Sequence, residues 1–228
     1  KFNPASITEQ IISSSLEEVA KHSMQITFLM TLTRDIPYEE NRRLLDIALD
    51  SKLSKHFVGI DIAGNEADIP LEKFKRLLKR VLTAGKGLTI HAGEAGPAEN
   101  VQEAINEGCH RIGHGVRAFD RKDILELATE RGITFEVCPT SNLQTSTIQN
   151  ITDLTLIELL DRGINITLNT DDPGISNTTL TQEYLTSARA FSLNKKNIHD
   201  LVINAIDGTF LSYSGKEDLK QELNNFTA

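Results

Sequence analysis

The sequence has no tryptophan and only two cysteines, Cys109 and Cys138, and it contains no CxxC pair. Closely spaced cysteine pairs mark redox motifs and structural zinc sites, so their absence argues against both classes. Two cysteines without such a motif are typical of free, inert thiols in a reducing compartment. We therefore expect a cytoplasmic protein.

Long apolar runs and an excess of basic residues are also missing. No stretch approaches the roughly 20 apolar residues that a membrane-spanning helix needs. The chain of 228 residues carries 24 Lys and Arg against 32 Asp and Glu, a net charge of −8, whereas nucleic-acid-binding proteins usually show a basic stripe. These absences leave a small molecule as the expected partner, with neither nucleic acid nor membrane. Nothing in the sequence indicates an oligomeric state.

Apolar residues alternate between helical and strand spacing along the chain. The pattern predicts helices near residues 7–19, 38–49, 71–82, 98–108, 122–132, 153–163, 180–191, 198–206 and 217–223. It predicts strands near residues 25–32, 57–63, 88–90, 111–113, 133–137 and 164–168, with a possible strand end at residues 1–4. Three consecutive helices stop at a glycine just before a strand, which favours parallel βαβ crossovers.

Such a sheet is either doubly wound or closed into a barrel. Neither GxGxxG nor GxxxxGK[ST] follows an early strand, which argues against a doubly wound nucleotide binder. A (β/α)₈ barrel takes about 250 residues, and this shorter chain already carries extra helices at its end. The sequence therefore predicts an α/β fold, an incomplete TIM-type barrel that lacks its first βα unit. Residues 1–228 are expected to form a single domain.

Polar residues follow the predicted strands where each one ends. His91 and Glu94 follow one strand, His114 another, and Asp171 with Asp172 a third. The carboxyl ends of barrel strands meet at one face, which is where the chemistry of barrel enzymes lies. Imidazole and carboxylate ligands suit zinc, which makes His91 and Asp171 candidate ligands. A catalytic zinc usually takes three protein ligands, so the recognisable set is incomplete.

Five stretches give the chain a resemblance to the adenosine deaminase family of metal-dependent amidohydrolase barrels, and they occur in the family's order. They are Gly59–Glu66, His91–Pro97, Arg111–Gly115, Glu136–Asn142 and Asn169–Pro173. The resemblance implies zinc-dependent hydrolysis of adenosine and deoxyadenosine to inosine-type products and ammonia, as in purine salvage.

The resemblance also implies a role for each matching residue. His91 and Asp171 would bind zinc, and His114 would orient the attacking water and help to deprotonate it. Glu94 would donate a proton to the purine ring nitrogen next to the attacked carbon. Asp172 and the backbone of Gly64 would bind the purine.

One family feature is missing from these 228 residues. Family members carry a His-x-His pair on the first barrel strand, and the sequence contains none. We expect these two further zinc ligands upstream of Lys1, so the chain alone should bind zinc poorly. Asn65 stands where the family usually has an aspartate, a change that we expect to be mild.

Other interpretations of the same residues remain open. The substrate could be another aminopurine, such as adenine, or the barrel could be inactive and serve as a binding scaffold. His91 and His114 could be structural histidines, and Asp171-Asp172-Pro173 could be a turn with a helix cap.

Overall fold

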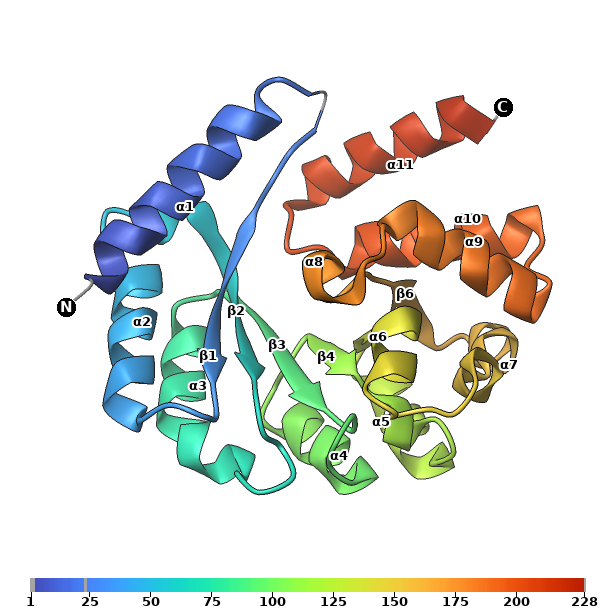
Figure 1. The fold of residues 1–228 in the computed structure, drawn as a ribbon, viewed down its shortest axis with the longest axis horizontal. Coiled ribbons are helices and arrows are strands. Elements are labelled where there is room, and N and C mark those ends of the chain that lie inside the picture. The colour runs from blue at the N-terminus through green and yellow to red at the C-terminus, as the bar shows by residue number, and fades with distance from the viewer. Residues whose placement is uncertain (1–2, 23, 228) are drawn as a thin grey trace. The chain divides into compact units, whose positions relative to one another are not determined.

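The computed structural model describes residues 3–22 and 24–227. The chain divides into two compact units, Lys1–Thr89 (the first unit) and Ile90–Ala228 (the second unit). The strands β1 to β6 follow one another in sequence order (Figure 1). Among the described residues, no helix is long and apolar enough to cross a membrane.

The first unit alternates helices with parallel strands. Its elements are α1 (Pro4–Val19), β1 (Phe28–Thr33), α2 (Tyr38–Asp50), a 3-10 turn (Ser54–His56), β2 (Phe57–Ala63), a second 3-10 turn (Leu71–Phe74) and α3 (Lys75–Thr83). β1 pairs with β2 in parallel, with Thr31 opposite Asp61. One face of α3 is buried through Leu77, Leu78 and Val81, as the apolar spacing of that segment predicts.

The strand β3 (Gly87–Ala92) runs from the first unit into the second. The helices of the second unit are α4 (Ala98–Asn106), α5 (Lys122–Glu130), α6 (Pro139–Gln144), α7 (Leu156–Asp161), α8 (Pro173–Ser176), α9 (Leu180–Phe191), α10 (Lys195–Gly208) and α11 (Tyr213–Thr227). Its remaining strands are β4 (Arg111–His114), β5 (Thr134–Val137) and β6 (Asn165–Leu168), and it has 3-10 turns at Val116–Ala118 and Ile151–Leu154.

The strands of the second unit also pair in parallel. Ile112 lies opposite Phe135, and Phe135 lies opposite Ile166, so that one apolar row crosses β4, β5 and β6. All three of these side chains are fully buried. α10 packs against β6 in the same unit. This alternation of parallel strands and covering helices confirms the predicted α/β class. Whether the whole chain is one domain stays a prediction.

Some predicted boundaries were wrong at the chain's start. Lys1 and Phe2, half of the possible strand end, lie outside the described residues. Asn3 and Pro4 instead begin α1: the Asn3 side chain accepts a hydrogen bond from the Ala5 N–H, and proline suits the first helical position. The strand expected from residue 25 begins at Phe28.

Later boundaries were predicted more closely. The three helices expected to stop at Gly108, Gly132 and Gly163 each end two residues earlier. The helix expected from Asp153 is broken, because a 3-10 turn ends at Thr155 in a left-handed conformation before α7 begins. The short helices α6 and α8 were not predicted. Both open with a proline and follow a strand end, where turns are the usual expectation.

Candidate metal and catalytic site

Histidines and carboxylates of the second unit gather where its strands end. His91 is the second-last residue of β3, and Glu94 lies three residues further on. His114 is the last residue of β4, and Asp171 follows β6. The rings of His91 and His114 lie 5.1 Å apart, centroid to centroid. Residues from separate parts of the sequence therefore converge, as expected for strand ends.

His114 lies at the centre of this cluster and is buried. Its Nε2 atom is 3.5 Å from Glu94 Oε2 and 3.9 Å from Asp171 Oδ2. On the opposite edge of the ring, Nδ1 lies 3.0 Å from the side-chain amide nitrogen of Asn142, which is fully buried. A buried amide held against one ring nitrogen restrains the rotation of the imidazole. His114 is thus oriented by one neighbour and faces two carboxylates.

Asp171 is held by a residue of α6. The hydroxyl of Ser141 donates a hydrogen bond of 2.7 Å to Asp171 Oδ2. Ser141 is buried, whereas about a third of the Asp171 side chain is exposed. Hydrogen bonds to a carboxylate are stronger than those between neutral groups, so this bond fixes the orientation of Asp171. The roles of Ser141 and Asn142 were not predicted, although both lie in a stretch that the sequence singled out.

The ring of His91 rests on the backbone of β4. A methyl group at Gly113 would lie 2.9 Å from two atoms of the His91 imidazole, closer than side-chain carbons pack. Only glycine leaves room for the ring in this position. The sequence showed a glycine beside His114 but no reason for it, because the neighbour that requires it comes from another strand.

Cys138 is the third group with a possible metal-ligand atom beside His114 and Asp171; these three atoms all lie within 4.8 Å of one another. Burial raises the pKa of the Cys138 thiol well above its usual value, and the negative charges of Asp171 and Glu136 raise it further. Only the thiolate is a good metal ligand. The environment therefore favours the neutral thiol, in line with the inert role expected from the sequence.

Asp172 caps a helix, one of the interpretations that the sequence left open. Its Oδ1 atom accepts hydrogen bonds from the backbone N–H groups of Gly174 and Ile175, which caps α8. Its Oδ2 atom has no hydrogen-bond partner among residues 3–22 and 24–227, and the residue is exposed. The helix cap thus occupies one oxygen and leaves the other for a ligand.

Gly64 belongs to the first unit, where it directly follows β2. Its φ of +88° is strained for other residues, and a side chain there would clash with Asp35 and Thr33. The next N–H, that of Asn65, donates a hydrogen bond of 3.2 Å to Asp35 Oδ2. The turn therefore needs a glycine for its own geometry. Binding of the purine by the Gly64 backbone stays a prediction.

The residues of the cluster fit a zinc ion. Imidazole nitrogens and carboxylate oxygens are the ligand types that zinc takes in catalytic sites. Two carboxylates, Glu94 and Asp171, face His114, and Oδ1 of the buried Asn142 has no hydrogen-bond partner in the described part of the chain. A cation would offset the negative charge gathered there. That His91 and Asp171 are the zinc ligands stays a prediction.

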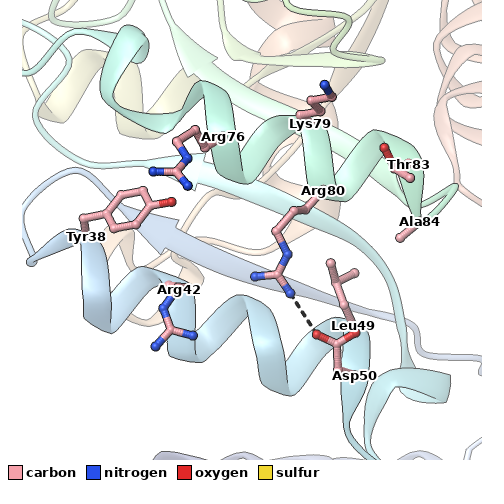
Figure 2. A pocket seen from close by; sticks show the side chains of 9 residues that line it. All are labelled: Tyr38, Arg42, Leu49, Asp50, Arg76, Lys79, Arg80, Thr83 and Ala84. Carbon is pink, nitrogen blue, oxygen red and sulfur yellow. Dashed lines mark hydrogen bonds and ion pairs between the residues drawn. The ribbon is translucent and has the colours of Figure 1, made fainter.

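A groove of about 740 Å³ lies elsewhere, between α2 and α3 of the first unit (Figure 2). It is lined by Tyr38, Arg42, Leu49, Asp50, Arg76, Lys79, Arg80, Thr83 and Ala84. Arg80 forms ion pairs of 2.8 Å with both Asp46 and Asp50, and Arg42 pairs with Asp46. Two of the four cationic side chains of the groove, Arg42 and Arg80, are thus paired with carboxylates. None of the predicted site residues lines the groove.

Solved structures with the same fold define the class of protein. An adenine deaminase from Arthrobacter aurescens superposes with a TM-score of 0.85 at 25% identity, covering 93% of this chain and 64% of that one. An Arabidopsis protein called ADAL, solved with IMP, gives 0.87 at 25% identity over 98% of this chain and 67% of that one. An amidohydrolase from Burkholderia ambifaria with bound Zn gives 0.89 at 22% identity, over 98% and 63%. The fold is therefore that of the barrel amidohydrolases.

Comparison of the sequence with known families identifies the family within this class. The family model for adenosine deaminase matches residues 1–226, and the chain therefore belongs to the adenosine deaminase family. A relative from Vibrio parahaemolyticus, named adenosine deaminase, is 34% identical over 224 residues. That match covers 98% of this chain and 66% of the relative, so the chain spans just under two thirds of that protein's length. The family is metal-dependent, as the resemblance implied.

Proposed function

We propose that the protein is a zinc-dependent adenosine deaminase that hydrolyses adenosine and deoxyadenosine to the corresponding inosine and ammonia. The observation that carries this proposal is the position of His114, which faces Glu94 and Asp171 while its ring lies beside that of His91. Membership of the adenosine deaminase family supports the choice of substrate.

His91 and Asp171 would hold the zinc ion. When bound, zinc supplies a nucleophile at neutral pH by lowering the pKa of water to about 7. His114 would orient the attacking water and take its proton.

Glu94 would donate a proton to the purine ring nitrogen next to C6, which makes the ring accept the water oxygen. The proton that His114 took from the water would pass to the C6 amino group, which leaves as ammonia, and the hydroxyl proton at C6 would return to Glu94 as the carbonyl forms. Asp172 would bind the other ring of the purine through Oδ2, the oxygen that its helix cap does not use. The backbone of Gly64 would bind the remaining edge nitrogen.

The substrate can be tested on the full-length protein with adenosine, adenine and AMP in parallel. We expect adenosine to lose absorbance at the purine band fastest, with release of one ammonia for each purine. Faster turnover of adenine would favour the second candidate, an adenine deaminase. The similarity to the Arthrobacter adenine deaminase structure supports this candidate. A folded protein with no bound zinc and no turnover would favour the third, a binding scaffold.

The role of Glu94 can be tested by Glu94→Gln. General acid catalysis contributes about 10²- to 10⁴-fold, so we expect kcat to fall by at least about 10²-fold while the zinc content stays unchanged. The matched control is Glu126→Gln, since Glu126 is an exposed side chain of α5. Near-normal turnover of Glu94→Gln would remove Glu94 from the mechanism.

We also propose a cytoplasmic location, which rests on the two free cysteines, Cys109 and Cys138. Fractionation of the source cells, followed by detection of the full-length protein, tests it.

A further inference from the structure

Glu183 of α9 is a carboxylate that is fully buried yet lies outside the proposed catalytic residues. Both of its oxygens are engaged. Oε1 accepts a hydrogen bond of 2.6 Å from the Thr178 hydroxyl, and Oε2 accepts one of 3.1 Å from the backbone N–H of Thr140. A buried carboxylate is costly unless hydrogen bonds compensate for its lost hydration. Its presence here therefore needs a structural or functional reason.

The bond to Thr140 reaches the start of α6. The first N–H groups of a helix have no partner within the helix and are usually satisfied by a capping side chain. The residue at the cap position of α6, Cys138, makes no such bond through its side chain. Glu183 supplies the acceptor instead, from 43 residues further along the chain.

α6 in turn contacts three of the proposed catalytic residues. Ser141 donates to Asp171, Asn142 contacts His114 at 3.0 Å, and the hydroxyl of Thr145, just after the helix, lies 3.4 Å from Glu94 Oε1. A helix of six residues has few internal hydrogen bonds to hold it. Its position must therefore be set by contacts with the rest of the second unit, of which the Glu183 bond is one.

We propose that Glu183 is a positioning residue, which fixes α6 so that Ser141, Asn142 and Thr145 hold the catalytic side chains in a reactive arrangement. The proposal rests on the proposed function. The proposal requires that residue 183 place a hydrogen-bond acceptor at the start of α6. It does not require that Glu183 carry a negative charge. A residue that merely filled space would have no such requirement.

Two substitutions separate acceptor position from charge. Glu183→Gln keeps an acceptor oxygen at the same distance from the backbone and removes the charge. Glu183→Asp keeps the charge but draws the acceptor back by one methylene group. Glu183→Ala removes both. Ser187 offers a matched control, because it lies one turn further along α9, is equally buried, and its hydroxyl has no partner within the described ranges.

The first measurement is steady-state kinetics of the full-length zinc enzyme with adenosine. Because small misplacements of catalytic groups are costly, we expect kcat to fall at least about 10-fold in Glu183→Asp and more in Glu183→Ala. Glu183→Gln should stay within about threefold of wild type, and KM should change less than about threefold throughout, since Asp172 and Gly64 lie outside α6. Ser187→Ala should match the wild type.

The second measurement is amide hydrogen exchange over residues 139–145, which needs neither zinc nor turnover. We expect faster exchange at Thr140 in Glu183→Asp and wild-type protection in Glu183→Gln. Wild-type kcat and protection in Glu183→Asp, or a larger loss in Glu183→Gln than in Glu183→Asp, would overturn the proposal even if Glu183→Ala failed to fold. If the wild-type protein does not deaminate adenosine, the proposed function fails, whereas the exchange data still test the anchoring of α6.

Discussion

His114 and Asp171 adopt left-handed backbone conformations, with φ values of 63° and 56°. Such conformations cost a residue other than glycine about 1–3 kcal/mol and persist where the surroundings enforce them. Here the surroundings are specific contacts: Asn142 against the His114 ring and Ser141 on the Asp171 carboxylate. Both of these residues have proposed catalytic roles, and left-handed conformations also occur at four other non-glycine residues, Ser146, Thr155, Asn177 and Ser192.

Gly113 provides a test of how tightly the cluster is packed. In Gly113→Ala the new methyl group would meet the His91 ring at 2.9 Å, so the imidazole must move. We expect the zinc affinity of the full-length protein to fall at least about 10-fold, the scale on which disturbed neighbours of a ligand act. Competition with a chromophoric chelator measures it.

The control for this substitution is Gly215→Ala in α11, where an added methyl group comes no closer than 3.5 Å to any neighbour. It should leave zinc affinity unchanged and add slightly to stability, because alanine favours the helix. Unchanged affinity in Gly113→Ala would show that His91 is not a ligand or tolerates displacement.

At the scale of elements, α2 and β1 are joined by one buried amide. Asn41 is fully buried, its Oδ1 accepts from the N–H of Thr33 at 3.0 Å, and its Nδ2 donates to the Thr33 carbonyl at 2.8 Å. The side chain satisfies both backbone groups of the last residue of β1. The end of this strand is thereby held against the helix.

We expect Asn41→Ala to lower the free energy of unfolding by about 1–3 kcal/mol, because two buried backbone groups lose their partner. Urea denaturation followed by circular dichroism measures the change. Arg43→Ala, at an exposed position of the same helix, should stay within about 0.5 kcal/mol of wild type. Equal stability of the two variants would show that water replaces the amide at no cost.

The longer elements followed from the sequence, whereas α6 did not. The apolar spacing of residues 71–82 and 180–191 predicted helices that the structure contains. The segment Pro139–Gln144 is short and rich in residues that favour turns, so no local pattern marked it as a helix. Its conformation depends on partners such as Glu183, which lie far away in the sequence.

At the scale of the whole molecule, the buried thiol of Cys109 predicts a dependence of folding stability on alkaline pH. Burial raises the pKa of Cys109 from about 9 to about 12. Above pH 9 the unfolded chain releases this proton while the folded chain keeps it until about pH 12, so the thiol's contribution to stability falls as the pH rises. The loss amounts to about 1.4 kcal/mol for each pH unit in that window.

We therefore expect the unfolding free energy of the wild type to fall more steeply between pH 9 and 11 than that of Cys109→Ala. The measurement is a series of urea titrations of both proteins at several pH values, and the steeper slope should be absent below about pH 8.5. Parallel curves for the two proteins across the range would contradict the buried, neutral thiol.

The sequence by itself determined the α/β class, the family and the residues at the strand ends, because apolar periodicity and short motifs are local properties. Only the tertiary structure decided which of those residues meet. The His114–Asn142 and Asp171–Ser141 contacts join positions 28 and 30 residues apart, and the Glu183–Thr140 bond spans 43. Such pairings depend on how strands and helices pack, and no periodicity within one segment encodes the distance to another. For the same reason the sequence shows that residue 113 is a glycine but not why. The reason is the ring of His91, which comes from another strand and lies beside it.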